Sequence, residues 1–170
     1  MDKTNIKLQQ LDKFERKLMK HGKVLTLKPK EDFLDDFFRE KGHNIEHLKA
    51  ENTRLHFGDE NYEGIVKESV IKLMNSLKQT ERFIGIWALD TLLNLDRLDI
   101  YYVLNRLYSV LVEKGLLYLS FRTGNEDCFE NGKWYTCFTE NELIDLIGFT
   151  DFSIVEMENS ENHINLILKK

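Results

Sequence analysis

Cysteine is scarce in this sequence of 170 residues, and long hydrophobic runs are missing. The two cysteines, Cys128 and Cys137, have no second pair beside them, so neither a disulfide framework nor a structural zinc site is supported, and two reduced thiols are expected. No apolar run approaches the roughly 18 to 20 residues of a membrane span. The polar start MDKTNIKLQQ lacks the apolar core of a signal peptide. We therefore expect a cytoplasmic protein with no membrane partner.

Basic charge is also outnumbered by acidic charge. Lys and Arg total 24 against 29 Asp and Glu, so the formal net charge is −5. Nucleic acids and anionic membranes bind basic surfaces, so neither is expected as a general partner. What is present is ordinary globular content, 42% hydrophobic and 31% charged, in a chain long enough to bury one core. We expect a single domain over residues 1–170.

Hydrophobic periodicity predicts alternating strands and helices. Helical spacing predicts helices over 3–21, 33–41, 97–113 and 140–147. Short apolar runs predict strands at 23–27, 45–48, 83–89, 116–121, 152–157 and 164–168. Residues 49–79 are the least legible; a helix is favoured there, although Gly64 to Val66 could equally start a strand.

Local stop and start signals support several of these elements. Gly22, Gly42 and Gly115 follow predicted helices as C-terminal stops, and Asp96 is the predicted N-cap of helix 97–113. Thr139 to Glu142 has the Thr-x-x-Glu form of a capping box. The short connection after 152–157 suits an antiparallel hairpin. Together these features predict a three-layer, Rossmann-like α/β sandwich, mostly parallel, with an antiparallel C-terminal strand.

The second half of the chain resembles a known family. Residues 83–149 are similar to class I S-adenosylmethionine-dependent methyltransferases, especially small ones of the tellurite-resistance and methyltransferase-11/12 type. The family's "FDGIWA", "SLLHL", "LKPGG", "LYLSFK" and "GRYFTYFTEEEL" segments correspond to Phe83 to Ala88, Thr91 to Leu95, Val112 to Gly115, Leu117 to Arg122 and Gly132 to Leu143. The resemblance implies the methyltransferase fold, with strand 83–89 beside strand 23–27.

The first half departs from the family at its cofactor loop. Gly22 to Leu25 matches the "GKVL" that precedes the family's "DxGxGxG" turn, but the next residues, Thr26 to Asp32, read TLKPKED without a glycine. Glycine is needed there because the backbone must approach the cofactor closely. Pro29 fixes φ and lacks an N–H, and Lys28 and Lys30 place cations where a sulfonium would lie. These changes oppose cofactor binding.

The resemblance also locates the remaining site positions. The vestigial cofactor-binding residues are Thr26, Lys28, Lys49, Trp87 and Leu89, and the substrate-loop residues are Arg122, Trp134 and Tyr135. Lys49 stands where the family has a ribose-binding acid, with Glu51 as a displaced substitute. Ile84 replaces the Asp of "FDGIWA" and Asn94 replaces the His of "SLLHL".

Other residues receive ordinary structural interpretations. Trp87 is read as core or cleft lining rather than a ring that stacks on the cofactor. His43, His47 and His56 are spaced too irregularly for a helix-face metal site, so they are expected to be surface imidazoles and no metal is expected. No catalytic nucleophile and base stand out. The acidic loop Gly124 to Glu130 could be a substrate lid or a recognition loop.

Three hypotheses follow. The leading one is a degenerate methyltransferase-fold protein that does not bind S-adenosylmethionine and acts as a binding or regulatory module. The second is an active small-molecule methyltransferase that uses S-adenosylmethionine in an unconventional pocket, and the third is a structural subunit of a complex. The partner is left open between another protein, a small molecule and a second copy of the chain.

Overall fold

The computed structural model describes residues 3–27, 32–47, 75, 77–78, 80–160 and 162–170. Lys28, Lys30, Lys49 and Glu51 lie outside the described residues, as does almost all of segment 49–79. Among the described residues, no helix is long and apolar enough to cross a membrane.

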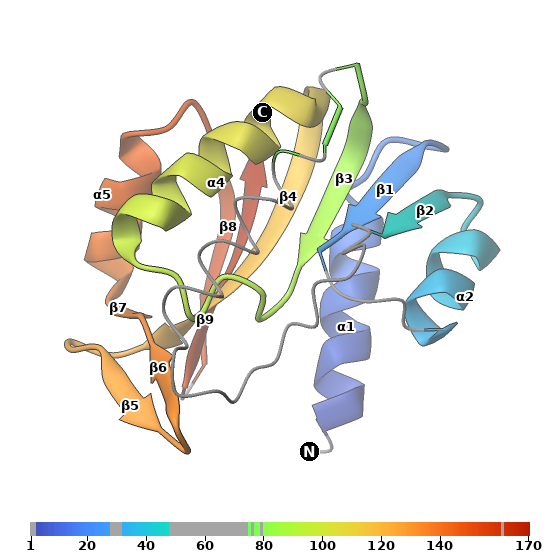
Figure 1. The fold of residues 1–170 in the computed structure, drawn as a ribbon. Helices are drawn as coiled ribbons and strands as arrows, with labels where there is room; N and C mark the ends of the chain where they lie inside the picture. The colour runs from blue at the N-terminus through green and yellow to red at the C-terminus, as the bar shows by residue number, and fades with distance from the viewer. Residues whose placement is uncertain (1–2, 28–31, 48–74, 76, 79, 161) are drawn as a thin grey trace.

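A mixed seven-stranded sheet forms the centre of the described structure (Figure 1). Its strands run in the order β2 (Asn44–His47), β1 (Lys23–Thr26), β3 (Phe83–Ala88), β4 (Leu111–Thr123), β9 (His163–Lys169) and β8 (Ser153–Asn159), and β7 (Cys137–Phe138) also pairs with β4. The first four strands pair in parallel, whereas β9 is antiparallel to both of its neighbours. The predicted mixed sheet is confirmed, and so is the placement of β3 beside β1.

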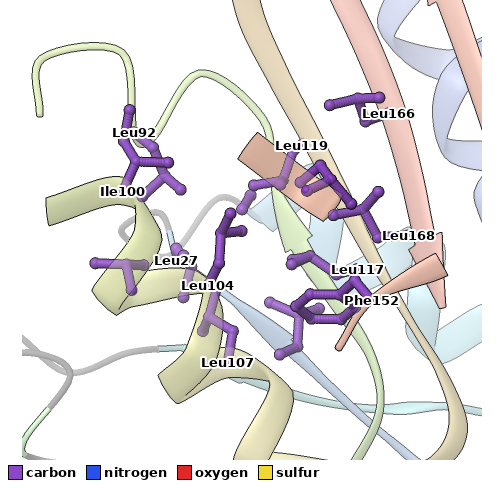
Figure 2. Close-up of a cluster of buried hydrophobic side chains, with 14 of the residues drawn as sticks. Leu27, Leu92, Ile100, Leu104, Leu107, Leu117, Leu119, Phe152, Leu166 and Leu168 are labelled. Carbon is purple, nitrogen blue, oxygen red and sulfur yellow. The ribbon is translucent and has the colours of Figure 1, made fainter. Parts of the chain in front are cut away.

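Helices cover both faces of this sheet, and the sheet divides the apolar core into two clusters. On one face, α4 (Arg97–Val110) and α5 (Glu140–Gly148) pack on a large apolar cluster. Figure 2 shows Leu104 and Leu107 of α4 on the side of Leu117 and Leu119 of β4, while Ile100 lies beside Leu92. On the other face, α1 (Lys3–Glu15) and α2 (Asp32–Glu40) contribute to a second cluster around Trp87. The three-layer architecture is therefore as predicted.

The first helix is shorter than the sequence indicates. We predicted 3–21, but α1 ends at Glu15, and the bonds from Lys17 N to Phe14 O and from Leu18 N to Glu15 O (3.1 and 2.9 Å) tighten the chain into a turn. His21 then takes a left-handed backbone conformation, with φ of 55°. The turn brings the Leu18 side chain against Gly85 of β3, where an added Cβ would lie 2.6 Å from a Leu18 methyl group. Packing on β3, rather than helical periodicity, decides where α1 ends.

The boundary between α4 and β4 was also predicted wrongly. The periodic apolar pattern extends to 113, yet α4 ends at Val110 and Leu111 already pairs with Phe83 of β3. The register then shifts, so that Gly85 pairs with Leu116, and Lys114 has φ of 64°. The last residue of the chain supports this irregular stretch, because Lys114 N donates to Lys170 O at 3.1 Å. Strand pairing far along the chain therefore overrides the local helical pattern.

Both predicted helix starts are confirmed at the atomic level. Asp96 caps α4, where its Oδ1 accepts from Asp99 N at 2.8 Å. Thr139 and Glu142 form the reciprocal capping box of α5: Glu142 N donates to Thr139 Oγ1 at 3.2 Å and Thr139 N donates to Glu142 Oε2 at 2.8 Å.

A two-stranded ribbon follows β4 and was not predicted. Strands β5 (Cys128–Glu130) and β6 (Lys133–Tyr135) pair in a region that begins in the acidic loop Gly124 to Glu130 and for which no strand was predicted. Asn131 and Gly132 join them, with φ of 51° and 75°. Two consecutive positive φ values are typical of the type I′ turn, and Asn-Gly is its preferred sequence. The Asn131-Gly132 pair was thus the available signal.

Candidate functional site

The carboxyl ends of β1 and β3 meet at the point where the chain order of the sheet reverses. The chain passes from β1 outward to β2 on one side, while β3 occupies the other side. Thr26 is in register with Trp87, and Leu27 N donates to Trp87 O at 3.1 Å. Open α/β sheets bind ligands at such a switch point. The structure brings three of the expected residues together here: Thr26, Trp87 and Leu89.

Side chains at these strand ends are buried within the protein. Thr26, Trp87 and Ala88 are each 0% exposed, Leu27 is 3% exposed and Leu89 is 9% exposed. A ligand cleft normally leaves part of its lining accessible when empty. The described strand ends offer little such surface.

Trp87 is held in an aromatic stack. Its ring lies 4.0 Å from the Tyr118 ring, nearly parallel to it, and 5.5 Å from the Phe14 ring of α1. Burial raises the pKa of Tyr118 far above its ordinary value of 10.0, and its hydroxyl donates to Asn165 Oδ1 at 3.1 Å. Trp87 Nε1 is buried and has no hydrogen-bond partner among the described residues. The ring is part of the core, and its N–H is the one unusual feature.

Sequence reasoning missed Asp90, which directly follows Leu89 and has φ of 53°. Asp90 N donates to Ser120 Oγ at 2.8 Å, and Ser120 Oγ donates back to Asp90 Oδ1 at 2.6 Å. His163 Nε2 lies 3.9 Å from the same carboxylate oxygen. This reciprocal pair of hydrogen bonds uses both the Ser120 hydroxyl and the Asp90 backbone N–H. It holds the chain in place as it leaves β3. An acid immediately after a buried strand was the available signal.

The end of β2 carries a histidine bound to a carboxylate. His47 Nε2 lies 2.6 Å from Asp35 Oδ1 of α2, and His43 Nε2 lies 3.1 Å from Glu15 Oε1 of α1. His43 is only 4% exposed, so the expectation of a surface imidazole is wrong there. These pairs join helices to the sheet. Among the described residues, no cluster of three or more metal-ligating side chains occurs.

The expected substrate-loop residues come from β4 and the β5–β6 ribbon. The Arg122 guanidinium carbon lies 3.7 Å above the Tyr135 ring, and Arg122 Nη1 donates to Glu130 Oε2 at 2.7 Å. Trp134 directly precedes Tyr135, so its side chain points to the opposite face of the ribbon, where it is 37% exposed. The structure therefore brings Arg122 and Tyr135 together but separates Trp134 from them.

The ribbon is tied to the segment that follows β3. Thr136 N donates to Leu93 O at 2.8 Å and Thr136 Oγ1 donates to Leu95 O at 2.6 Å. Asn94 Nδ2 donates to Trp134 O. Asn94, which stands where the family has a histidine, thus binds backbone, and its amide cannot replace a histidine as a base.

S-adenosylmethionine requires a backbone cradle for its methionine part and a carboxylate for its ribose, according to the family resemblance. The described end of β1 consists of Thr26 and Leu27, both buried. The carboxylate of Asp35, beside the end of β2, is engaged by His47. The residues that correspond in sequence to the family's cofactor loop and ribose-binding acid, 28–31 and Lys49, lie outside the described residues.

Comparison with solved structures defines the fold. A Burkholderia thailandensis 1,6-didemethyltoxoflavin-N1-methyltransferase with bound S-adenosylhomocysteine is similar over 87% of this chain and 70% of its own, with 18% identity and a TM-score of 0.61. A Methanosarcina mazei S-adenosylmethionine-dependent methyltransferase is similar over 91% and 95%, with 13% identity and a TM-score of 0.63. TehB from Haemophilus influenzae is similar over 87% and 57%, with 13% identity and a TM-score of 0.57.

No protein-family model matches the sequence, and no curated protein matches it. At these identities the structural likeness establishes the fold alone. The chain has the fold of class I S-adenosylmethionine-dependent methyltransferases.

Proposed function

We propose that this methyltransferase-fold chain does not bind S-adenosylmethionine and acts as a binding or regulatory module. The observation that carries the proposal is the burial of Thr26, Trp87 and Ala88 at the ends of β1 and β3, each of which is 0% exposed. A fold that keeps its sheet and fills its ligand edge retains a scaffold for recognition without a place for the cofactor. Its partner is another protein, a small molecule or a second copy of the chain.

The sequence of the first turn supports the same proposal. Residues 26–32 lack glycine and include Pro29, whereas the corresponding turn of the family uses glycine so that the backbone can approach the cofactor. The same stretch of sequence contains Lys28 and Lys30, whose positive charge would disfavour a sulfonium cation. Both features disfavour the cofactor independently of the buried strand ends.

Isothermal titration calorimetry with S-adenosylmethionine and S-adenosylhomocysteine tests the proposal. We expect no saturable heat for either compound at concentrations up to about 1 mM, which is about a thousand times a dissociation constant of about 1 μM. The variants Lys28→Glu and Lys30→Glu serve as matched controls and should neither create nor abolish a signal. Saturable micromolar binding of either compound by the parent protein would defeat the proposal, and a change of at least tenfold in either lysine variant would place that binding at the first turn.

One observation favours a second candidate, an active methyltransferase with an unconventional pocket. Trp87 Nε1 is a buried donor without a partner among the described residues, and such a donor is costly unless a ligand accepts from it. Trp87→Phe removes this donor and keeps an aromatic ring. If calorimetry does detect cofactor binding, this variant should weaken it about tenfold; unchanged affinity would remove the support that Trp87 lends to the enzyme.

A further inference from the structure

The two cysteines lie side by side although they belong to different strands. Cys128 begins β5, Cys137 begins β7, and their Sγ atoms are 3.7 Å apart. Both are free thiols. A disulfide has an S–S bond of about 2.05 Å, so the sulfurs need a modest approach to join. We propose that Cys128 and Cys137 are a reversible thiol–disulfide site that covalently closes the ribbon onto the main sheet.

The fold holds Cys137 in place from several directions. Cys137 is paired with Arg122 of β4, and its N–H donates to Asp127 Oδ1 at 3.0 Å. Gly124 allows close approach of the preceding chain, since a Cβ there would lie 3.1 Å from the Cys137 Cβ. Cys137, which pairs with the end of β4, is therefore the firmly held member of the two cysteines.

The β5–β6 ribbon brings Cys128 next to Cys137. It pairs with Tyr135, two residues before Cys137, because the Asn131-Gly132 turn folds β5 back on β6. Arg122 Nη1 donates to Cys128 Sγ at 3.6 Å while its guanidinium covers Tyr135. Ten residues of chain are thus closed into a loop whose ends already touch at the two sulfurs.

The two thiols differ in accessibility, which gives them different roles. Cys137 is 3% exposed, and burial, with a further contribution from Cys128, raises the pKa of its thiol to about 11. Cys128 is only partly buried. An oxidant in solution therefore reaches Cys128 first, and Cys137 acts as the resolving thiol.

The reaction needs an oxidant of the low-molecular-weight disulfide class, such as oxidised glutathione. The Cys128 thiolate attacks one sulfur of that disulfide, which releases one glutathione thiolate and leaves a mixed disulfide on Cys128. The Cys137 thiolate then attacks the Cys128 sulfur, the mixed disulfide bond breaks and the second glutathione leaves. The two protein thiols lose two protons and two electrons, and two molecules of reduced glutathione carry them away.

Closure would act on the surroundings of the ribbon. Thr136 donates to the carbonyl oxygens of Leu93 and Leu95, and the Trp134 carbonyl oxygen accepts from the Asn94 side chain, so the segment after β3 is bound to the ribbon. A covalent loop restricts the motion of this part of the chain. The inference is independent of whether the protein binds S-adenosylmethionine.

Redox titration in mixtures of reduced and oxidised glutathione, with acid quenching and intact-mass analysis, tests the site. We expect the folded wild-type protein to lose two hydrogen atoms without a lasting glutathione adduct. Cys137→Ser should accumulate a mixed disulfide at Cys128, and Cys128→Ser should react at least tenfold more slowly because the remaining thiol is buried.

The same titration on the wild-type chain in concentrated urea provides a comparison that does not depend on variants folding. The equilibrium constant for internal disulfide formation should be at least tenfold larger in the folded protein, because the fold holds the sulfurs together. An equal or smaller constant in the folded protein, or a wild-type protein that stops at the mixed disulfide, would overturn the proposal.

Discussion

At Trp87, a single side chain joins the first helix to the centre of the sheet. The ring is fully buried between Tyr118 and Phe14, which come from β4 and α1. Its importance for stability does not depend on whether the chain binds a cofactor. Packing in the core and contact with a cofactor are therefore two separate roles of Trp87 that can be tested separately.

Trp87→Ala should lower the free energy of unfolding by roughly 3 to 5 kcal/mol, because it removes buried volume that neighbouring rings cannot refill. Trp87→Phe should lower it by roughly half as much or less, since one ring is kept. Urea denaturation followed by circular dichroism measures both. Equal losses for the two variants would mean that a phenyl ring cannot replace the packing of the indole at this position.

Glu142 provides a pH-dependent contribution at the start of α5. Thr139 N donates to its carboxylate and Thr139 Oγ1 also contacts it, so these hydrogen bonds lower the Glu142 pKa below its usual 4.5. A group whose folded pKa is lowered stabilises the fold above its unfolded pKa, and this contribution is lost as the pH falls through the folded pKa.

Glu142→Gln should therefore lose less stability than wild type between about pH 5 and about pH 3, because its side chain does not take up a proton there. Thermal unfolding across this range measures the difference. Parallel pH profiles for the two proteins would show that the capping carboxylate is not linked to folding.

At the scale of elements, Gly132 and Gly148 differ in whether the backbone conformation requires glycine. Gly132 has φ of 75° in the ribbon turn, whereas Gly148 ends α5 without a positive φ. Nothing lies within 4 Å of an added Cβ at either residue. A comparison of alanine substitutions at Gly132 and Gly148 therefore measures the effect of backbone conformation without a difference in steric contact.

Gly132→Ala should destabilise the protein by about 1 kcal/mol, since alanine resists a left-handed conformation. Gly148→Ala should be neutral or stabilise by up to about 1 kcal/mol, since alanine favours the helix. Chemical denaturation of the two variants provides the comparison. A loss at Gly148 equal to that at Gly132 would contradict the conformational explanation.

At the scale of the whole molecule, the sheet separates two apolar clusters. Phe14 and Trp87 belong to the cluster under α1, and Ile100 belongs to the cluster under α4. Residues in contact change stability non-additively, whereas residues in separate clusters act almost independently. The layered architecture thus makes a prediction about coupling.

Phe14→Leu combined with Trp87→Phe should show a coupling energy of at least about 0.5 kcal/mol, because the two rings are in contact. Phe14→Leu combined with Ile100→Val should be additive within about 0.5 kcal/mol. Double-mutant cycles from urea denaturation measure both values. Strong coupling between Phe14 and Ile100 would mean that the sheet does not insulate its two faces.

Several features of this fold could be read from residues near one another in the chain. The Asp96 cap and the Thr139–Glu142 box act within one helical turn, and the fully buried β3 follows from an unbroken apolar run. The missing glycines in 26–32 are likewise a local property. Such features depend on neighbouring residues alone, so the sequence was sufficient to predict them.

Other features depended on contacts between distant parts of the chain. Helix α1 ends at Glu15 because the following turn packs on β3, and α4 ends at Val110 because Leu111 pairs with Phe83. The burial of the strand ends at the switch point and the meeting of the two cysteine sulfurs have the same origin. Hydrophobic periodicity reports which side of an element is apolar, but strand pairing and packing between remote segments determine where that element stops and which side chains meet.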